Sequence, residues 1–287
     1  MTLTLRVTAC LALLFASCKK SDEVPAYVVI PSVTVDATNE EGGSTSKITD
    51  VWVSVNDRSL GIWELPARVP VLASGSNKIN VAAAVKKNGA FDDRLRYPFY
   101  QSYNAQVDLA SEMSVLLAPV VTYSEPLSFW LESFNEGSNQ FNIPEESDTT
   151  LLLYTAASNP DIILDGSSCG GFVLTPERPR MSMYTDENFT PTVGPAFLEL
   201  DYSTDMEITI GFRYVQDGNQ RGEPWLILVP TASEGNLRWN KVYIDVSNFL
   251  NTAGISARNF YLAAALPSGR NSAHVYLDNF KLVKNAP

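Results

Sequence analysis

Short stretches in which apolar and polar residues alternate, or in which apolar residues run together, follow one another along most of this chain. Gly, Pro, Asn and Asp separate these stretches, whereas apolar residues at helical spacing are scarce. Alternation with a period of two places every second side chain on the same face, which is typical of strands with one buried face. The pattern therefore predicts an all-β protein made of sandwiches or barrels.

A first group of strands is expected in residues 26–123. Its members are Tyr27–Val35, Ile48–Val55, Leu60–Leu65, Lys78–Val85, Arg94–Tyr100, Ala105–Leu109 and Ser114–Val121. Turn residues at Asn56-Asp57-Arg58 and Asn88-Gly89 separate some of them. This spacing is typical of a small immunoglobulin-like or prealbumin-like sandwich, for which a spacer role without a ligand is the simplest hypothesis. Tyr97 and Tyr100 belong to an aromatic and basic cluster that could form a protein contact.

The pattern breaks at Ser124-Glu125-Pro126, and a second group of strands is expected in residues 124–287. Its members are 129–134, 171–174, 180–185, 197–202, 207–215, 225–229, 239–246, 260–266 and 274–283. Asp217-Gly218 is typical of a hairpin turn. One short helix is predicted, with Ser247 as its N-cap and Gly254 as its end. Trp225 lies in an unbroken apolar strand and is expected in the core.

The start of the chain has the pattern of an export signal. Residues 1–6 carry one positive charge, and Val7–Ala16 is apolar apart from Thr8, which is too short for the roughly 20 residues that cross a bilayer. The stretch Leu14-Phe15-Ala16-Ser17-Cys18 resembles a bacterial lipobox, although Phe15 replaces the usual aliphatic residue. The resemblance implies that residues 1–17 are a signal peptide and that Cys18 is acylated and anchored in a membrane. An ordinary secretory signal with an incidental cysteine is the alternative.

The tether that follows, residues 18–25, contains Lys19-Lys20-Ser21-Asp22-Glu23. It resembles the export signal of Bacteroidota lipoproteins, which implies the outer face of the outer membrane, with its periplasmic face as the alternative. The whole chain has a net charge of −11. A nucleic-acid binder needs a basic surface to displace counterions, so the acidic balance argues against nucleic acid as a partner.

Few residues in the chain suit catalysis. His274 is the only histidine, and with Cys18 acylated only Cys169 would remain after Cys10 is removed with the signal peptide. Cys169 is expected in or near the core, without a disulfide. The segment from Glu199 to Asp205 resembles the opening of a Glu-x-Asp-x-x-Glu strand in jelly-roll glycosidases, but Ser203 and Thr204 stand where the second glutamate belongs. We therefore expect no enzyme, and a glycoside hydrolase is the weakest of the alternatives.

The second region resembles the jelly rolls of carbohydrate-binding modules. The resemblance rests on Leu131-Glu132-Ser133-Phe134 near its start and on residues 275–283, Val-Tyr-Leu-Asp-Asn-Phe-Lys-Leu-Val, at its end. In such modules the first and last strands are neighbours, and an acid from each often helps to hold a structural calcium ion. Carried over, these acids would be Glu132 and Asp278. The alternative is that Asp278 caps a strand end and Glu132 is exposed.

Strand alternation also predicts a face for a ligand. If the strands share a sheet, the face opposite the core would carry Trp239, Tyr243, Arg213, Glu199 and Asp201. Aromatic rings beside polar groups suit a polysaccharide or oligosaccharide, although these residues could equally pack under a loop or against the first region. Two functions remain: a surface lipoprotein that binds a carbohydrate, and a structural or assembly lipoprotein that contacts an outer-membrane transporter or secretion complex.

Overall fold

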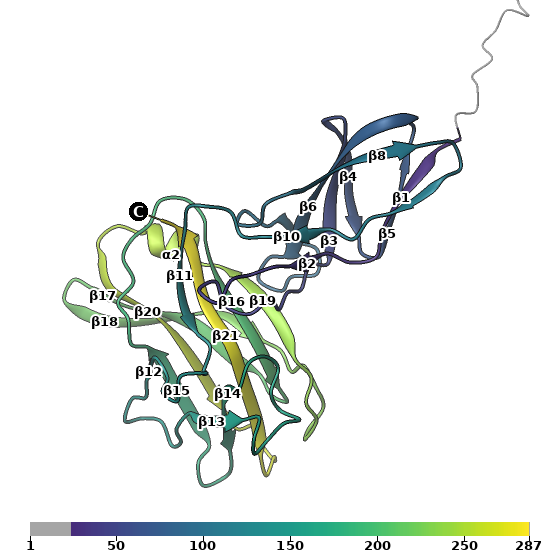
Figure 1. Ribbon diagram of the computed structural model, residues 1–287. Helices are drawn as coiled ribbons and strands as arrows, with labels where there is room; N and C mark the ends of the chain where they lie inside the picture. The colour runs from purple at the N-terminus through teal and green to yellow at the C-terminus, as the bar shows by residue number, and fades with distance from the viewer. Residues whose placement is uncertain (1–23, 287) are drawn as a thin grey trace, which may run out of the picture.

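The computed structural model describes residues 24–286, and Figure 1 shows two β-regions, the first above and to the right of the second. The predicted all-β class is confirmed, because strands make up both regions and the described part of the chain adds one short helix, α2 (Ser247–Asn251), between two of them. Within these residues no helix is long and apolar enough to span a membrane.

The first region is a small sandwich. Its strands are β1 (Ala26–Ile30), β2 (Thr34–Val35), β3 (Asp50–Val55), β4 (Arg58–Glu64), β5 (Ala67–Val71), β6 (Gly75–Lys86), β7 (Arg94–Arg96), β8 (Tyr103–Leu109), β9 (Ser114–Leu116) and β10 (Val120–Val121). One sheet has the order β5-β1-β9, and the facing sheet has the order β4-β3-β6-β7 with β8 also on β6. Val28, Val53 and Val81 are fully or almost fully buried between them. The predicted strand 27–35 is divided at Pro31, since proline cannot donate a backbone hydrogen bond.

The second region is a larger sandwich. Its strands are β11 (Leu127–Glu132), β12 (Phe141–Asn142), β13 (Leu152–Thr155), β14 (Ser168–Leu174), β15 (Arg180–Thr185), β16 (Ala196–Thr204), β17 (Ile208–Gln216), β18 (Asn219–Leu228), β19 (Asn240–Asp245), β20 (Ile255–Ala265) and β21 (Ala273–Asn285). One sheet, β13-β14-β21-β16-β19 with β11 also on β21, is called the covered sheet below. The other, β12-β15-β20-β17-β18, is called the open sheet. Their inner faces share one core that includes Leu198, Ile210 and Phe260.

Local predictions in this region had mixed outcomes. The Asp217-Gly218 hairpin is confirmed, with both residues at positive φ between β17 and β18. The N-cap prediction is wrong, because the Ser247 hydroxyl bonds Asp245 and makes no cap hydrogen bond. The prediction of a buried Trp225 is also wrong, since this side chain is 42% exposed. It lies on β18, an edge strand whose Pro224 is tolerated because one side of the strand is unpaired.

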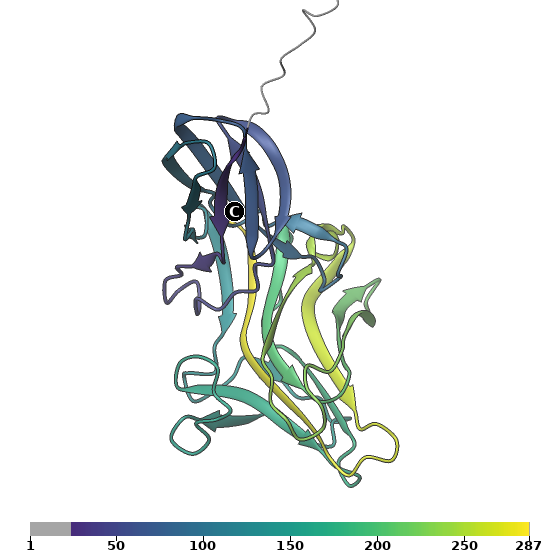
Figure 2. The same ribbon diagram turned by 90° about the vertical axis from the view of Figure 1, so that its right-hand side faces the viewer.

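The first region packs on the outer face of the covered sheet. Figures 1 and 2 show the segment after β2 reaching down beside β21. The turn after β6 contacts β19, where the Asn88 N–H donates to the Tyr243 carbonyl at 2.8 Å. Phe197, Tyr243 and Val283 of the second region belong to the first region's core. The two sandwiches therefore share a buried interface.

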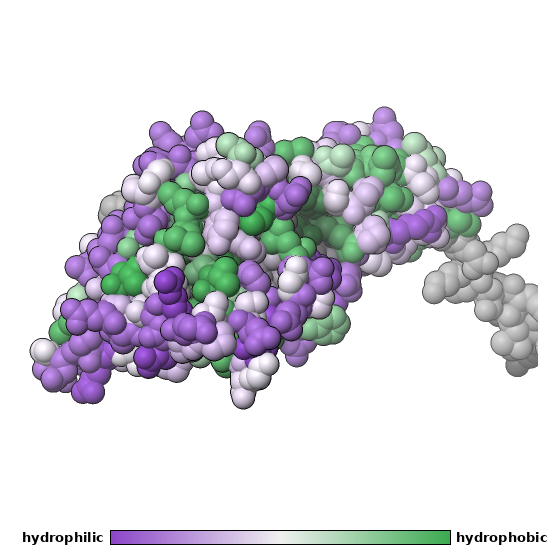
Figure 3. All heavy atoms as spheres, turned by 90° about the horizontal axis from the view of Figure 1, so that it is seen from below, coloured by the Kyte–Doolittle hydropathy of each residue, from purple (hydrophilic) through white to green (hydrophobic). Residues whose placement is uncertain are grey.

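The rest of the surface is mixed in character. Figure 3 shows one face of the molecule, on which apolar side chains gather in separate patches between polar ones. A single broad apolar face would mark a large protein or membrane contact. No such broad apolar face is visible on this side of the described residues (Figure 3).

Candidate functional site

The covered face holds three of the five predicted ligand residues. Glu199, Asp201 and Tyr243 are at most 2% exposed, because the first region lies over them. Their odd positions in β16 and β19 do point away from the sandwich core, as alternation predicted. The prediction that they line an open groove is wrong, because that outer face is an interior surface between the two sandwiches.

Glu199 lies at the centre of this interface. The Tyr97 hydroxyl donates to its carboxylate at 2.6 Å and the Tyr123 hydroxyl at 2.8 Å. The ammonium groups of Lys241 and Lys281 lie 3.5 and 3.6 Å from the same carboxylate. Burial opposes ionisation of Glu199, but the two lysines and two hydroxyls outweigh burial and keep its pKa below the usual range. The first region thus supplies hydrogen bonds that hold a buried ion pair of the second.

A second part of the interface surrounds Asp201. Its carboxylate accepts hydrogen bonds from Thr45 and Lys241, the latter at 3.2 Å. Asp278 lies opposite Asp201 in the strand register and is 1% exposed. Burial, together with the negative charges of Asp201 and Asp165, raises the pKa of Asp278 to about 8. With Asp278 protonated, Glu199 and Asp201 balance the charges of Lys241 and Lys281.

The remaining predicted ligand residues lie elsewhere. Trp239 is half-buried, and its indole N–H donates to the Ile162 carbonyl at 3.0 Å, so it packs beneath the loop between β13 and β14. Arg213 is on β17 in the open sheet, whereas the other four residues lie on or beside the covered sheet. The structure therefore does not bring the five predicted residues into one site.

The predicted calcium pair does not assemble either. Glu132 follows Trp130 on the core side of β11 and accepts the N–H groups of Phe134 and Gln140. Asp278 faces the other side of the covered sheet, beside Asp201. Among residues 24–286 no group of three or more His, Cys, Asp or Glu side chains could hold a metal ion. Calcium binding stays a prediction without an assigned site.

Among residues 24–286, no strand of the first region packs on the outer face of the open sheet (Figure 1). Tyr184 of β15 and Tyr261 of β20 are cross-strand partners on this face, and both are partly exposed. The guanidinium carbon of Arg213 lies 4.1 Å from the centre of the Tyr184 ring, which is a cation–π contact. We call this outer face, with Tyr184, Tyr261 and Arg213 on it, the open face.

Gly211 determines how Tyr261 lies. A Cβ atom built on Gly211 would be 2.4 Å from two carbons of the Tyr261 ring, which no real side chain allows. The ring therefore lies over bare backbone at this position and has room only because residue 211 is glycine. A ring that lies along the sheet presents its other face to solvent.

A hollow of about 440 Å³ lies further along the same strands, and its nearest lining residues, Ser182 and Ala263, are two positions from Tyr184 and Tyr261. Small side chains, Ser182 and Ala263, form its floor, and Thr209 lies beside them. Arg180 and Glu207 stand at its sides. The open face thus combines flat aromatic rings, a depression and charged or hydroxyl groups that can form hydrogen bonds.

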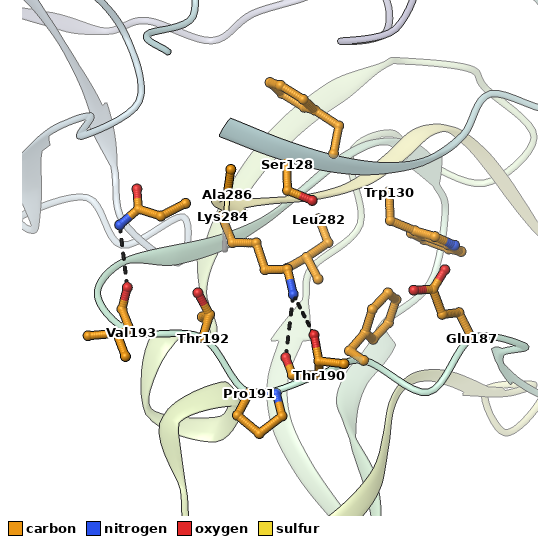
Figure 4. A pocket seen from close by; sticks show the side chains of 13 residues that line it. Ser128, Trp130, Glu187, Thr190, Pro191, Thr192, Val193, Leu282, Lys284 and Ala286 are labelled. Carbon is orange, nitrogen blue, oxygen red and sulfur yellow. Dashed lines mark hydrogen bonds between the residues drawn. The ribbon is translucent and has the colours of Figure 1, made fainter. Parts of the chain in front are cut away.

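Another hollow, of about 530 Å³, lies between the ends of β11 and β21 and residues 187–193. Figure 4 shows the Lys284 ammonium turned across it toward Thr190, whose hydroxyl accepts a hydrogen bond at 3.1 Å. Asn285 likewise donates to the Val193 carbonyl. These polar groups hold the loop in place, so this hollow offers a ligand less than the open face does.

Sequence reasoning missed Tyr184 and Tyr261. Alternation in residues 180–185 places Tyr184 opposite Met181 and Met183, which are buried, so the signal was present there. For Tyr261 the signal is that a glycine, Gly211, stands opposite it in the neighbouring strand and leaves room for its ring. That signal could be read only once the strand order was known.

Comparison with known proteins gives distant likenesses. No family model and no curated protein matches the chain. A solved family 61 carbohydrate-binding module in complex with β-1,4-galactotriose is 13% identical, covers 56% of this chain and 90% of its own, and has a TM-score of 0.33. A family 16 carbohydrate-binding module is 15% identical over 50% of this chain and 90% of its own, with a TM-score of 0.32. A structure described among promiscuous carbohydrate-binding modules of the β-sandwich superfamily is 10% identical over 82% of this chain and 85% of its own, with a TM-score of 0.36. With scores this low, function has to be argued from the chain's own residues.

Proposed function

We propose that the second region binds a carbohydrate chain on its open face, without catalysis, and that the protein is a lipoprotein anchored through Cys18 at the surface of the outer membrane. The observation that carries the binding proposal is the tyrosine pair Tyr184 and Tyr261, laid along the open sheet beside Arg213. The apolar face of a pyranose ring packs on an aromatic ring, while its hydroxyl groups need planar polar partners at the edge.

The position of the acids supports binding over hydrolysis. Retaining glycosidases need two carboxyl groups about 5–5.5 Å apart that a substrate can reach. Glu199 and Asp201, the acids of the glycosidase-like segment, are buried and paired with lysines. Asp205 is buried as well and accepts hydrogen bonds from Arg270 and His274. This segment thus contributes to the interface and to the core edge of the second region.

The membrane anchor rests on the sequence alone, since Cys18 lies outside the described residues. The described chain begins at Val24, at the end of the first region that is far from the second (Figure 1). An anchor at Cys18 would therefore leave the open face at a distance from the membrane. Metabolic labelling with a palmitate analogue checks this, because label on the native protein and none on Cys18→Ser is expected. Equal labelling of both proteins would contradict it.

The binding proposal is tested with residues 24–287, which contain both sandwiches. We expect saturable binding to one class of polysaccharide on a glycan array and in affinity gels, run with and without calcium. Tyr261→Ala and Tyr184→Ala should each weaken that binding about tenfold, which corresponds to one lost aromatic contact.

Tyr27→Ala is the matched control, because the Arg68 guanidinium also lies over the Tyr27 ring, but in the first region. It should leave binding unchanged. No binding across neutral, acidic and amino-sugar polymers would sink the proposal, and so would an equal loss in the control.

A further inference from the structure

A third hollow, of about 220 Å³, lies on the other side of the edge strand β18. Its floor is aromatic: the rings of Phe212 and Phe249 are stacked with centroids 4.2 Å apart, and the Trp225 ring is tilted against Phe212 at 5.3 Å. Trp225 remains 42% exposed. We call this hollow the Trp225 groove. A large aromatic side chain left open beside a packed aromatic floor is a candidate platform for a ligand.

The groove is built by five separate elements. Strand β17 supplies Phe212, β18 supplies Trp225 and α2 supplies Phe249, while the start of β20 supplies Ile255 and the end of β19 supplies Asp245. The first region fixes the last of these, because Asn88 accepts the Asp245 N–H at 2.8 Å. The shape of the groove is therefore set by packed elements and by the interface.

The rim of the groove is polar and acidic. Gln216, Glu223, Asp245 and Asn248 line it, and none of its lining residues is a lysine or an arginine. Asp245 uses one carboxylate oxygen to bind Ser247, and no described residue donates to the other. The amides of Gln216 and Asn248 make no side-chain hydrogen bond with the described residues. These groups can accept and donate hydrogen bonds at the edge of a ring placed on Trp225.

From these observations we infer that the Trp225 groove binds a single neutral pyranose unit, as a site separate from the open face. The two carboxylates repel an anionic sugar and accept hydrogen bonds from hydroxyl groups. The open face, in contrast, carries Arg213 and Arg180. A protein with both sites would hold a polysaccharide at two points and gain avidity from both.

The test uses the indole N–H signals of the five tryptophans in an NMR spectrum of residues 24–287 labelled with nitrogen-15. The signal missing from Trp225→Ala identifies Trp225. We expect it to shift saturably with a methyl glycoside of glucose, galactose, mannose or N-acetylglucosamine. Glucuronate and galacturonate should not shift it. Trp52→Ala, in which a 40% exposed tryptophan of the first region is removed, should bind the neutral glycoside unchanged.

Four outcomes would overturn this inference in whole or in part. No shift of the Trp225 signal with any neutral glycoside removes the site, and an equal shift with a uronate removes its charge preference. A shift that depends on protein concentration alone would replace the sugar with a second copy of the chain. Loss of the shift in the combined variant of Tyr184→Ala and Tyr261→Ala would make the groove part of the open face. The combined variant also separates the two proposals. If it keeps the Trp225 shift and binds polysaccharide as well as the native protein does, the proposed function fails and this inference stands.

Discussion

The two outer faces of the second sandwich carry similar kinds of residue, but one is buried under the first region and the other is exposed to solvent. Both combine tyrosines with charged side chains on alternate positions of their strands. On the covered face these groups meet a second protein surface, so Glu199 and its lysines are dry and fully paired. On the open face Tyr184, Tyr261 and Arg213 remain partly exposed to solvent. The comparison teaches that the environment of a residue, and not its type, separates a structural cluster from a binding surface.

The largest loss of stability is expected when the charge balance of the covered face is broken. Lys241→Met removes the cation that Glu199 and Asp201 share and leaves two buried carboxylates with Lys281 alone. Loss of one partner of a buried ion pair costs about 3–5 kcal/mol, so the free energy of unfolding in urea should fall by that amount.

Arg180→Met is the control for this change, because the Arg180 side chain of the Arg180–Asp148 pair is 66% exposed to solvent. It should change the unfolding midpoint little. If Lys241→Met is as mild as the control, the interface is not the dry, paired cluster described above.

A second test concerns the proton on Asp278. Its pKa is about 8 in the folded protein and about 3.9 in an unfolded chain, so the folded state holds the proton more tightly. The contribution of Asp278 to the free energy of unfolding is fully present below about pH 4 and is lost as the pH rises to about 8. The total loss is on the order of a few kcal/mol. Asp278→Asn imitates the protonated acid, so it should remove this slope and stabilise the protein at pH 8.

Urea unfolding of the native protein and of Asp278→Asn, measured from pH 4 to pH 8, gives the free energy of unfolding of each as a function of pH. Asp57→Asn, at an exposed aspartate of the first region, should leave the curve unchanged. Parallel curves for Asp278→Asn and the native chain would show that Asp278 is ionised in the folded protein at neutral pH.

The smallest loss of stability is expected from a substitution on the open face. Arg213→Ala removes the cation from the Tyr184 ring at an accessible position, where such a contact is worth about 0.5–1 kcal/mol. Thermal unfolding should therefore change slightly, while glycan affinity on the open face should fall. A stability loss as large as that of Lys241→Met would place Arg213 in a structural cluster like that of Glu199, and the comparison between the faces would fail.

Much of the fold could be predicted from residue patterns, but the candidate site could not. Alternation correctly assigned Glu199, Asp201 and Tyr243 to the face opposite the core. It could not reveal that two segments far earlier in the chain would lie on that face: Tyr97 is 102 residues before Glu199, and Lys47 is 196 residues before Tyr243. Tyr97 and Tyr100 had already been singled out as a contact cluster, but the partner proved to be the chain itself. Trp225 was misjudged because an apolar run looks the same in a central strand and in an edge strand.

The sequence by itself determined the class of this protein, because period-two alternation and turn residues are local properties that each strand carries within itself. It also determined the Asp217-Gly218 hairpin, because the turn geometry depends on two neighbouring residues. Only the tertiary structure decided which sheet is covered, which tyrosines stay open and where Trp225 lies. Those outcomes depend on which distant segments pack together, and a polar residue that faces outward reads the same in the sequence whether water or another part of the chain lies beyond it.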